Sequence, residues 1–147
     1  FFSRPLRNLV YYYGALQALH LISLFASSII FLKKGSLSLL APPPLSGWTK
    51  QALYFFIIMG IVDAANTIIS LIFVRLFFQK RKKSLVLGLI TLSISFYSIV
   101  IYAFPVIFSG AFLHNLITYL VISLVFFPVI ILYYLLIKTI VCSPIFE

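Results

Sequence analysis

Four long runs of apolar residues, separated by short polar segments, dominate the sequence. They cover about residues 9–32, 51–78, 85–108 and 112–137. Each run is long enough to cross about 30 Å of hydrocarbon as a helix with a rise of 1.5 Å per residue. The pattern predicts an all-α membrane protein, with residues 1–147 forming a single domain, a bundle of four transmembrane helices.

The longest break between these runs, residues 33–50, is predicted to be an outer loop. It contains three consecutive prolines, which favour an extended backbone and cannot continue a helix: Pro42, Pro43 and Pro44. Its apolar residues indicate that it lies on the membrane surface or against a partner rather than free in water: Leu37, Leu39, Leu40, Ala41 and Leu45.

The basic residues predict which way the helices face. Eleven Lys and Arg oppose two acids, Asp63 and Glu147, so the formal net charge is +9. Basic residues at the ends of spans collect on the cytoplasmic or matrix side, where they meet anionic headgroups. Eight of the eleven lie on the side that we therefore expect to be inner: Arg4, Arg7, Arg75, Lys80, Arg81, Lys82, Lys83 and Lys138. Both termini are expected on this side, in the plasma membrane of a prokaryote or an organellar inner membrane.

The composition also bears on the class of partner. Because 63% of the residues are hydrophobic and 9% charged, too little polar sequence remains to cover a water-soluble globule. The basic excess does not predict binding to nucleic acid, because no soluble segment offers a basic face. We expect membrane lipids and other membrane protein subunits as partners.

One acid, Asp63, stands almost midway along the second predicted span. An ionisable group near the bilayer centre costs at least about 2.5 to 3.5 kcal/mol and is normally turned inward and partnered. Asn66, Thr67 and Ser70 follow at i+3, i+4 and i+7, so the four residues share one helical face. This face is the strongest candidate for a functional site.

The other spans carry polar stripes that can meet this face. Tyr13, Gln17, His20 and Ser27 follow one side of the first span, and Asn115, Tyr119 and Ser123 one side of the fourth. In the third span Thr91, Ser95, Ser98 and Tyr102 recur at helical spacing, so Leu92, Ile99 and Val106 are expected to be relatively exposed. The expected partner of Asp63 is His20, Gln17 or Tyr97. Pro128 predicts a kink in the fourth span, because it leaves the carbonyl of Leu124 without its usual donor.

Two interpretations of these stripes remain open. Hydroxyl and amide side chains can simply tie helices together, at about 0.6 to 2 kcal/mol per bond. Alternatively, they surround a site for a proton, a cation or another ligand. An Asp63 buried without a cation favours the neutral carboxyl and the structural interpretation, whereas a neighbouring His20 or a bound cation favours the second. The candidate ligand- or proton-binding residues are Asp63, Asn66, Thr67, His20, Gln17, Ser98 and Tyr97.

Cofactor and catalytic signals are weak. His20 and His114 differ in depth by roughly 15 Å at the helical rise, so one haem does not readily use both. With Cys142 as the single cysteine and two acids far apart, no metal and no cofactor are predicted. A triad of Asp63, His20 and Ser98 is unspecific, and no recognised catalytic motif occurs. A non-catalytic role is therefore favoured, with an intramembrane enzyme as the third choice.

In its architecture the chain resembles the EXPERA membrane proteins of sterol metabolism, which have four spans and a long outer first loop. The resemblance rests on Pro43, Pro44 and Trp48 before the second span and on Phe127 and Pro128 in the last. The acidic pair of such proteins has no counterpart here. Ser28 stands where the resemblance implies an acid, and Asp63 lies too deep along its helix.

The expected function is that of an accessory or structural subunit, without catalytic activity, in a larger membrane complex. It rests on the short extramembrane segments and on the lack of a soluble domain. The alternative is a small transporter, or a four-helix protein that binds a lipid or another ligand through Asp63 in the middle of the membrane.

Overall fold

The structure, a computed structural model, describes residues 2–36 and 41–142, and in these residues it contains helices and no strand. The helices are α1 (Arg4–Lys34), α2 (Lys50–Phe78), α3 (Lys83–Phe108), the short α4 (Ala111–His114) and α5 (Leu116–Cys142). All but α4 are long and apolar enough to cross a membrane. The predicted all-α class with four such helices is confirmed, and it indicates a multi-pass membrane protein.

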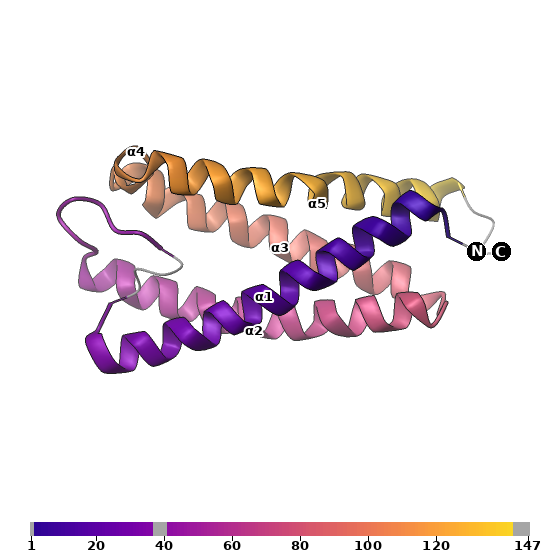
Figure 1. Cartoon of the computed structure of the whole chain (residues 1–147), viewed down its shortest axis with the longest axis horizontal. Coiled ribbons are helices and arrows are strands. Elements are labelled where there is room, and N and C mark those ends of the chain that lie inside the picture. Colours follow the sequence, from indigo (N-terminus) through magenta and orange to yellow (C-terminus); the bar gives the residue numbers. More distant parts are fainter. Residues whose placement is uncertain (1, 37–40, 143–147) are drawn as a thin grey trace.

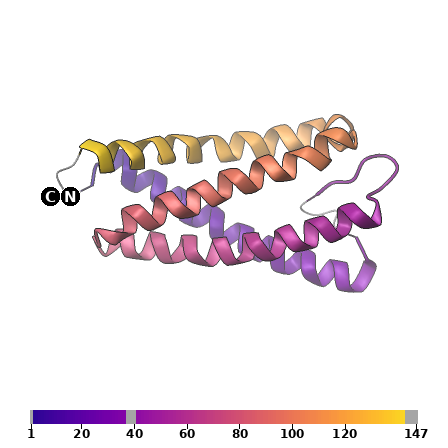
Figure 2. The same ribbon diagram turned by 180° about the vertical axis from the view of Figure 1, so that it is seen from behind.

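The four long helices form a ring in the order α1, α2, α3, α5. α1 packs against α2 and α5, and α3 packs against the same two helices. The start of α1, the turn between α2 and α3, and the end of α5 lie at one end of the bundle, here called the terminal end (Figure 1). The opposite end, with α4 and residues 41–49, is called the loop end. Figure 2 shows α2 and α3 crossing in front of α1.

The helices begin and end where local chemistry allows. α1 starts five residues earlier than predicted, because Pro5 is well suited to a first turn, and it stops at Gly35, whose left-handed φ of 66° caps the last turn. α2 begins after Thr49, whose side chain accepts a hydrogen bond from the Ala52 amide at 3.2 Å. α5 continues through Pro128 to Cys142 as one helix, so the proline does not interrupt it.

Two separate apolar clusters hold the bundle, one near each end. The terminal-end cluster joins all four long helices through these buried residues: Leu6, Val10, Tyr13, Phe73, Phe77, Leu85, Leu92, Val129, Leu132 and Leu136. The loop-end cluster is smaller and contains Ala41, Phe56, Val106, Ala111 and Tyr119. The polar stripes of the long helices run through the stretch between these clusters, and two of their members, Tyr13 and Tyr119, belong to the clusters themselves.

The loop packs against its own bundle, as far as it is described. Ala41 is 3% exposed, and the Trp48 ring meets Phe56 edge-on at a centroid distance of 4.9 Å. Leu45, in contrast, is 87% exposed. The prediction that the apolar loop residues lie on the surface or against a partner is thus wrong for Ala41, because the bundle itself covers it. Leu37, Leu39 and Leu40 lie outside the described residues.

Candidate functional site

The candidate site is a polar layer between the two apolar clusters, with Asp63 of α2 at its centre. Asp63 is half-buried. Its stronger side-chain interaction is with the hydroxyl of Ser98 on α3, and a weaker one is with the imidazole of His20 on α1. The interaction with His20 is mutual. α1 and α2 run antiparallel side by side, which brings His20 near enough to Asp63 for an electrostatic interaction. A direct contact between the two side chains stays a prediction.

Asn66 ties α2 to α3 one turn from Asp63. Its amide nitrogen donates to the Ser95 hydroxyl at 2.9 Å and to the Thr91 carbonyl at 3.2 Å. Ser95 also donates to the Thr91 carbonyl at 3.0 Å. Both Asn66 and Thr91 are buried. These bonds are the helix-joining role that the structural interpretation assigns to such residues.

Three buried polar atoms in the same stretch nevertheless lack a hydrogen-bond partner among the described residues: Ser27 Oγ, Asn66 Oδ1 and Ser98 Oγ. The side chains that carry them are 4 to 5% exposed. Leaving such an atom unpaired costs about 1 to 3 kcal/mol. The Ser98 hydroxyl approaches Asp63 without reaching hydrogen-bond geometry. The layer therefore has more polar groups than its own bonds satisfy.

The side of the layer nearer the terminal end is closed by better-satisfied groups. The hydroxyls of Tyr13 and Ser70 lie 2.8 Å apart and are buried. Gln17 and Thr67, two further candidates, are 5% and 1% exposed. They are therefore in the interior, as their stripes predict, while the role of each as a ligand-binding residue stays a prediction.

The stripe of α3 faces the interior as expected, but its surroundings differ from the prediction. Thr91 and Ser98 are buried, and Ile99 is 40% exposed. Leu92 and Val106 were expected to be exposed, and this is wrong, since they are 0% and 2% exposed. The reason is that α3 has neighbours on two sides, α2 and α5, so residues flanking the stripe are covered as well.

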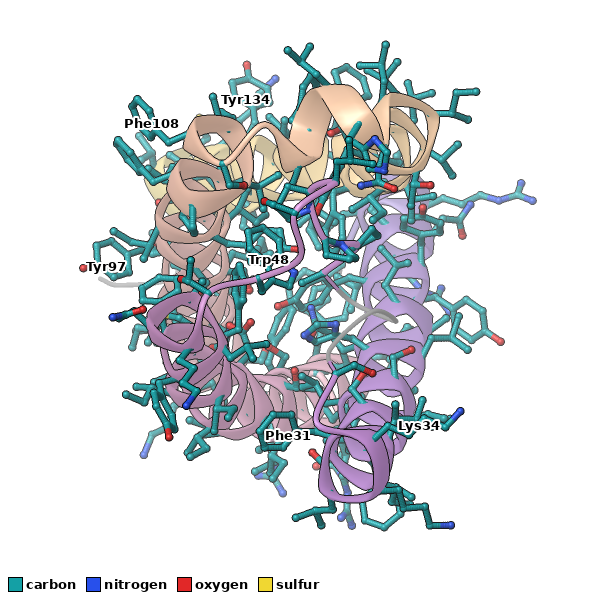
Figure 3. The ribbon with its side chains drawn as sticks, turned by 90° about the vertical axis from the view of Figure 1, so that its left-hand side faces the viewer. Phe31, Lys34, Trp48, Tyr97, Phe108 and Tyr134 are labelled. Atoms are coloured by element: carbon teal, nitrogen blue, oxygen red, sulfur yellow. The ribbon has the colours of Figure 1, made fainter. Side chains whose placement is uncertain are left out.

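Tyr97 does not partner Asp63. It is 67% exposed, and its side chain points away from the bundle (Figure 3). One residue corresponds to about 100° of rotation on a helix, so Tyr97 cannot face the same way as its neighbour Ser98. The expected contact is wrong for this geometric reason.

The stripe of α5 serves a different purpose from the one expected. Asn115 donates to the Pro43 carbonyl at 2.8 Å, and Tyr119 donates to the Pro42 carbonyl at 2.9 Å. Ser123 bonds to its own helix at the Tyr119 carbonyl. The first two residues therefore hold the loop. Only the polar character of the loop backbone at its prolines hinted at this role, because proline carbonyls accept hydrogen bonds that no helix or strand uses.

One contact of α1 with α5 was missed entirely. The Tyr12 hydroxyl donates to the Val125 carbonyl at 2.7 Å. This carbonyl lies in the turn before Pro128, where the missing amide and the bulk of the ring weaken the helical bonding. The carbonyl that Pro128 leaves without a helical donor is that of Leu124, so Tyr12 bonds to the carbonyl next to it.

The side chains of the layer can hydrogen-bond to one another or to a small polar group, and Asp63 and His20 can exchange protons. Within residues 2–36 and 41–142, no group of three or more His, Cys, Asp or Glu side chains is placed to hold a metal ion. His114 is on α4, away from His20. Comparison of the chain with protein families, with curated proteins and with solved structures found no match.

Proposed function

We propose that this protein is a small membrane protein that binds or transports a small ligand in its polar layer, with Asp63 as the charged or proton-carrying group. This was the alternative interpretation of the sequence, and the geometry now favours it. The accessory-subunit interpretation stays as the second candidate.

The observation that carries the proposal is the unbalanced polarity around Asp63. A structural network is expected to satisfy its own members, because each unpaired buried group costs free energy. Around Asp63, Asn66 Oδ1 is buried and unpaired within the described chain, and Ser98 Oγ has no bond of good geometry there beyond its approach to Asp63. A ligand or water that bonds to these atoms removes the cost. Polar groups left unsatisfied by the fold itself are typical of binding sites.

Native mass spectrometry of the protein purified in mild detergent tests this proposal. We expect the chain to carry a non-covalent mass of small-molecule size, lost on raising the collision energy before the chain unfolds. Phospholipid adducts are the internal control, because they appear as a series of known masses and bind to the outer surface. Stoichiometric protein subunits without a small-molecule mass would contradict the proposal.

The second candidate, an accessory subunit of a larger membrane complex, is favoured by Tyr97. Its hydroxyl lies near the middle of α3 on an exposed face, and the described residues offer it no hydrogen bond. Hydroxyls that face lipid find no partner there. A neighbouring membrane protein with an acceptor at this depth would satisfy it. The same spectra test this, since Tyr97→Phe should then release the partner subunit and leave any small-molecule mass in place.

The membrane topology is part of the proposal and has its own test. We expect the terminal end to be inner, because most basic residues lie there. With Cys142 replaced by serine, an impermeant thiol reagent should label Lys82→Cys only from the inner face and Ser46→Cys only from the outer. Both positions are exposed, whereas Ser84 beside the turn is buried and makes a poor reporter. Labelling of Lys82→Cys from outside would overturn this orientation.

A further inference from the structure

We propose that residues 41–49 form a lid over the loop end of the polar layer, and that the lid opens by releasing its hydrogen bonds to α5. The proposal rests on the proposed function, because a lid matters only if something enters the layer. It concerns how the site is reached rather than what it binds.

At this end α1 and α5 are not packed against each other. The contacts of α1 with α5 lie towards the terminal end, at Tyr12 with Val125 and in the cluster of Leu6 and Val10 with α5. Towards the loop end α1 departs from α5 and runs beside α2 (Figure 1), where Leu24 is the neighbour of Gly60. No residue of α1 belongs to the loop-end cluster within the described chain.

Residues 41–49 lie at the loop end, where α1 and α5 are apart. In the view from the loop end, the segment crosses between the helices and Trp48 lies near the middle of the ring (Figure 3). The side chains beneath it are Phe56, Tyr102 and Tyr119, since Trp48 contacts Phe56 and the Phe56 ring lies 5.4 Å from that of Tyr102. Aromatic rings therefore separate the lid from Asp63 and Ser98.

Two polar bonds join the lid to Asn115 and Tyr119, and a third closes it on itself, beside the apolar contacts of Ala41 and Trp48 with the loop-end cluster. Trp48 Nε1 donates to the Ala41 carbonyl at 2.8 Å and so closes the segment on itself. Asn115 and Tyr119 hold the Pro43 and Pro42 carbonyls. The outer side of the segment, at Leu45 and Ser46, is exposed.

The lid continues directly into α2, and it is bonded to Asn115 at the break between α4 and α5. Gly47 has a φ of 76°, and an added β-carbon would meet no atom within 4 Å. Thr49 caps α2, so the segment turns sharply just before the start of this helix. Asn115 lies at the break between α4 and α5, outside regular helical geometry. A small movement at this break withdraws its amide from Pro43. The closed form is therefore stabilised by side chains and not by the backbone of the bundle.

The test measures how fast a reagent reaches the polar layer from the loop end. Ser98→Cys is a near-isosteric reporter, introduced with Cys142→Ser in full-length protein in proteoliposomes. A small, charged, impermeant thiosulfonate is applied from the loop-end side. We expect Tyr119→Phe combined with Asn115→Ala to raise the modification rate of the reporter about tenfold, because two hydrogen bonds of the closed state are lost. Tyr119→Phe alone should give a smaller increase.

A matched control removes the phenolic oxygen of a tyrosine that does not contact the lid. Tyr133→Phe deletes the hydroxyl that lies 3.0 Å from Ser93 Oγ, away from the lid, and should leave the rate unchanged. Equal rates in the lid variants and the parent would overturn the proposal, as would an equal increase in Tyr133→Phe. If the double variant does not fold, Tyr119→Phe decides alone, because it removes one oxygen and retains the ring.

The lid and the proposed function can fail separately. A faster reporter rate in the lid variants, with no small-molecule mass in the native spectra, keeps the lid and rejects the ligand-binding function. An unchanged rate together with a bound mass rejects the lid and keeps the function, and it implies entry from the side of the bundle.

Discussion

Replacing Asp63 with asparagine is expected to weaken the binding of the small molecule by about tenfold or more while the protein remains folded. Asparagine keeps the shape and the hydrogen-bonding ability of the side chain but removes its charge and its proton exchange. A loss of one charge-assisted bond to a ligand is worth about 1.5 to 3 kcal/mol, which is a factor of about ten or more in affinity. The measurement is the fraction of chains that carry the mass in native spectra.

The stability of a second variant separates function from structure. Asp63→Leu should raise the free energy of unfolding in detergent by about 1 to 3 kcal/mol, because a carboxylate at this depth is costly and Asp63 meets no hydrogen-bond geometry with Ser98. Asn66→Leu, on the same helix face, should instead lower stability by about 1 to 3 kcal/mol, because it removes the bonds to Thr91 and Ser95. If Asp63→Leu destabilises as much as Asn66→Leu, Asp63 is a structural residue and the functional proposal fails.

Replacing Gly88 with alanine is expected to lower the free energy of unfolding by about 1 to 3 kcal/mol. A β-carbon at Gly88 would lie 2.6 Å from Cε2 and 2.9 Å from Cζ of Phe73. The ring cannot easily move away, because Phe73 is 0% exposed and has Tyr13 and Phe77 as ring neighbours. This clash outweighs the gain of up to about 1 kcal/mol that alanine brings to a helix.

Gly60 provides the matched control on the neighbouring helix. Its added β-carbon would meet only Leu24 Cδ2, at 3.9 Å, which is an ordinary contact, so Gly60→Ala should be neutral or slightly stabilising. Unfolding in detergent, followed by helical circular dichroism, compares the two variants. Adding Phe73→Leu to Gly88→Ala should recover part of the loss. Equal stability of the two glycine variants would contradict the predicted clash between α2 and α3.

The sequence by itself determined the class of the protein and the number of its long helices. In lipid the backbone must satisfy its own hydrogen bonds, so a long apolar stretch can be assigned directly as a helix that crosses the membrane. The burial of Asn66 and Ser98 also followed from helical spacing, since one face of a helix repeats every three to four residues.

The sequence also contained the reason why Tyr97 fails as a partner of Asp63. Its position is off the stripe of Thr91, Ser95 and Ser98 by a rotation that the helix geometry specifies. Helical spacing alone therefore excludes Tyr97 as a partner of Asp63, whereas it does not predict the burial of Leu92. A sequence does not state how many neighbours a helix has, and α3 has two.

Only the tertiary structure decided which stripe meets which group. Asn115 and Tyr119 share a face of α5, but spacing alone does not say that this face receives the carbonyls of Pro42 and Pro43 rather than Asp63. That outcome depends on the tilt of α1, which leaves the loop end for residues 41–49 to cover. α1 is bonded to α5 near the terminal end, from the Tyr12 hydroxyl to the Val125 carbonyl. Contacts so distant in sequence leave no periodic signal, because periodicity records only how residues share the surface of one helix.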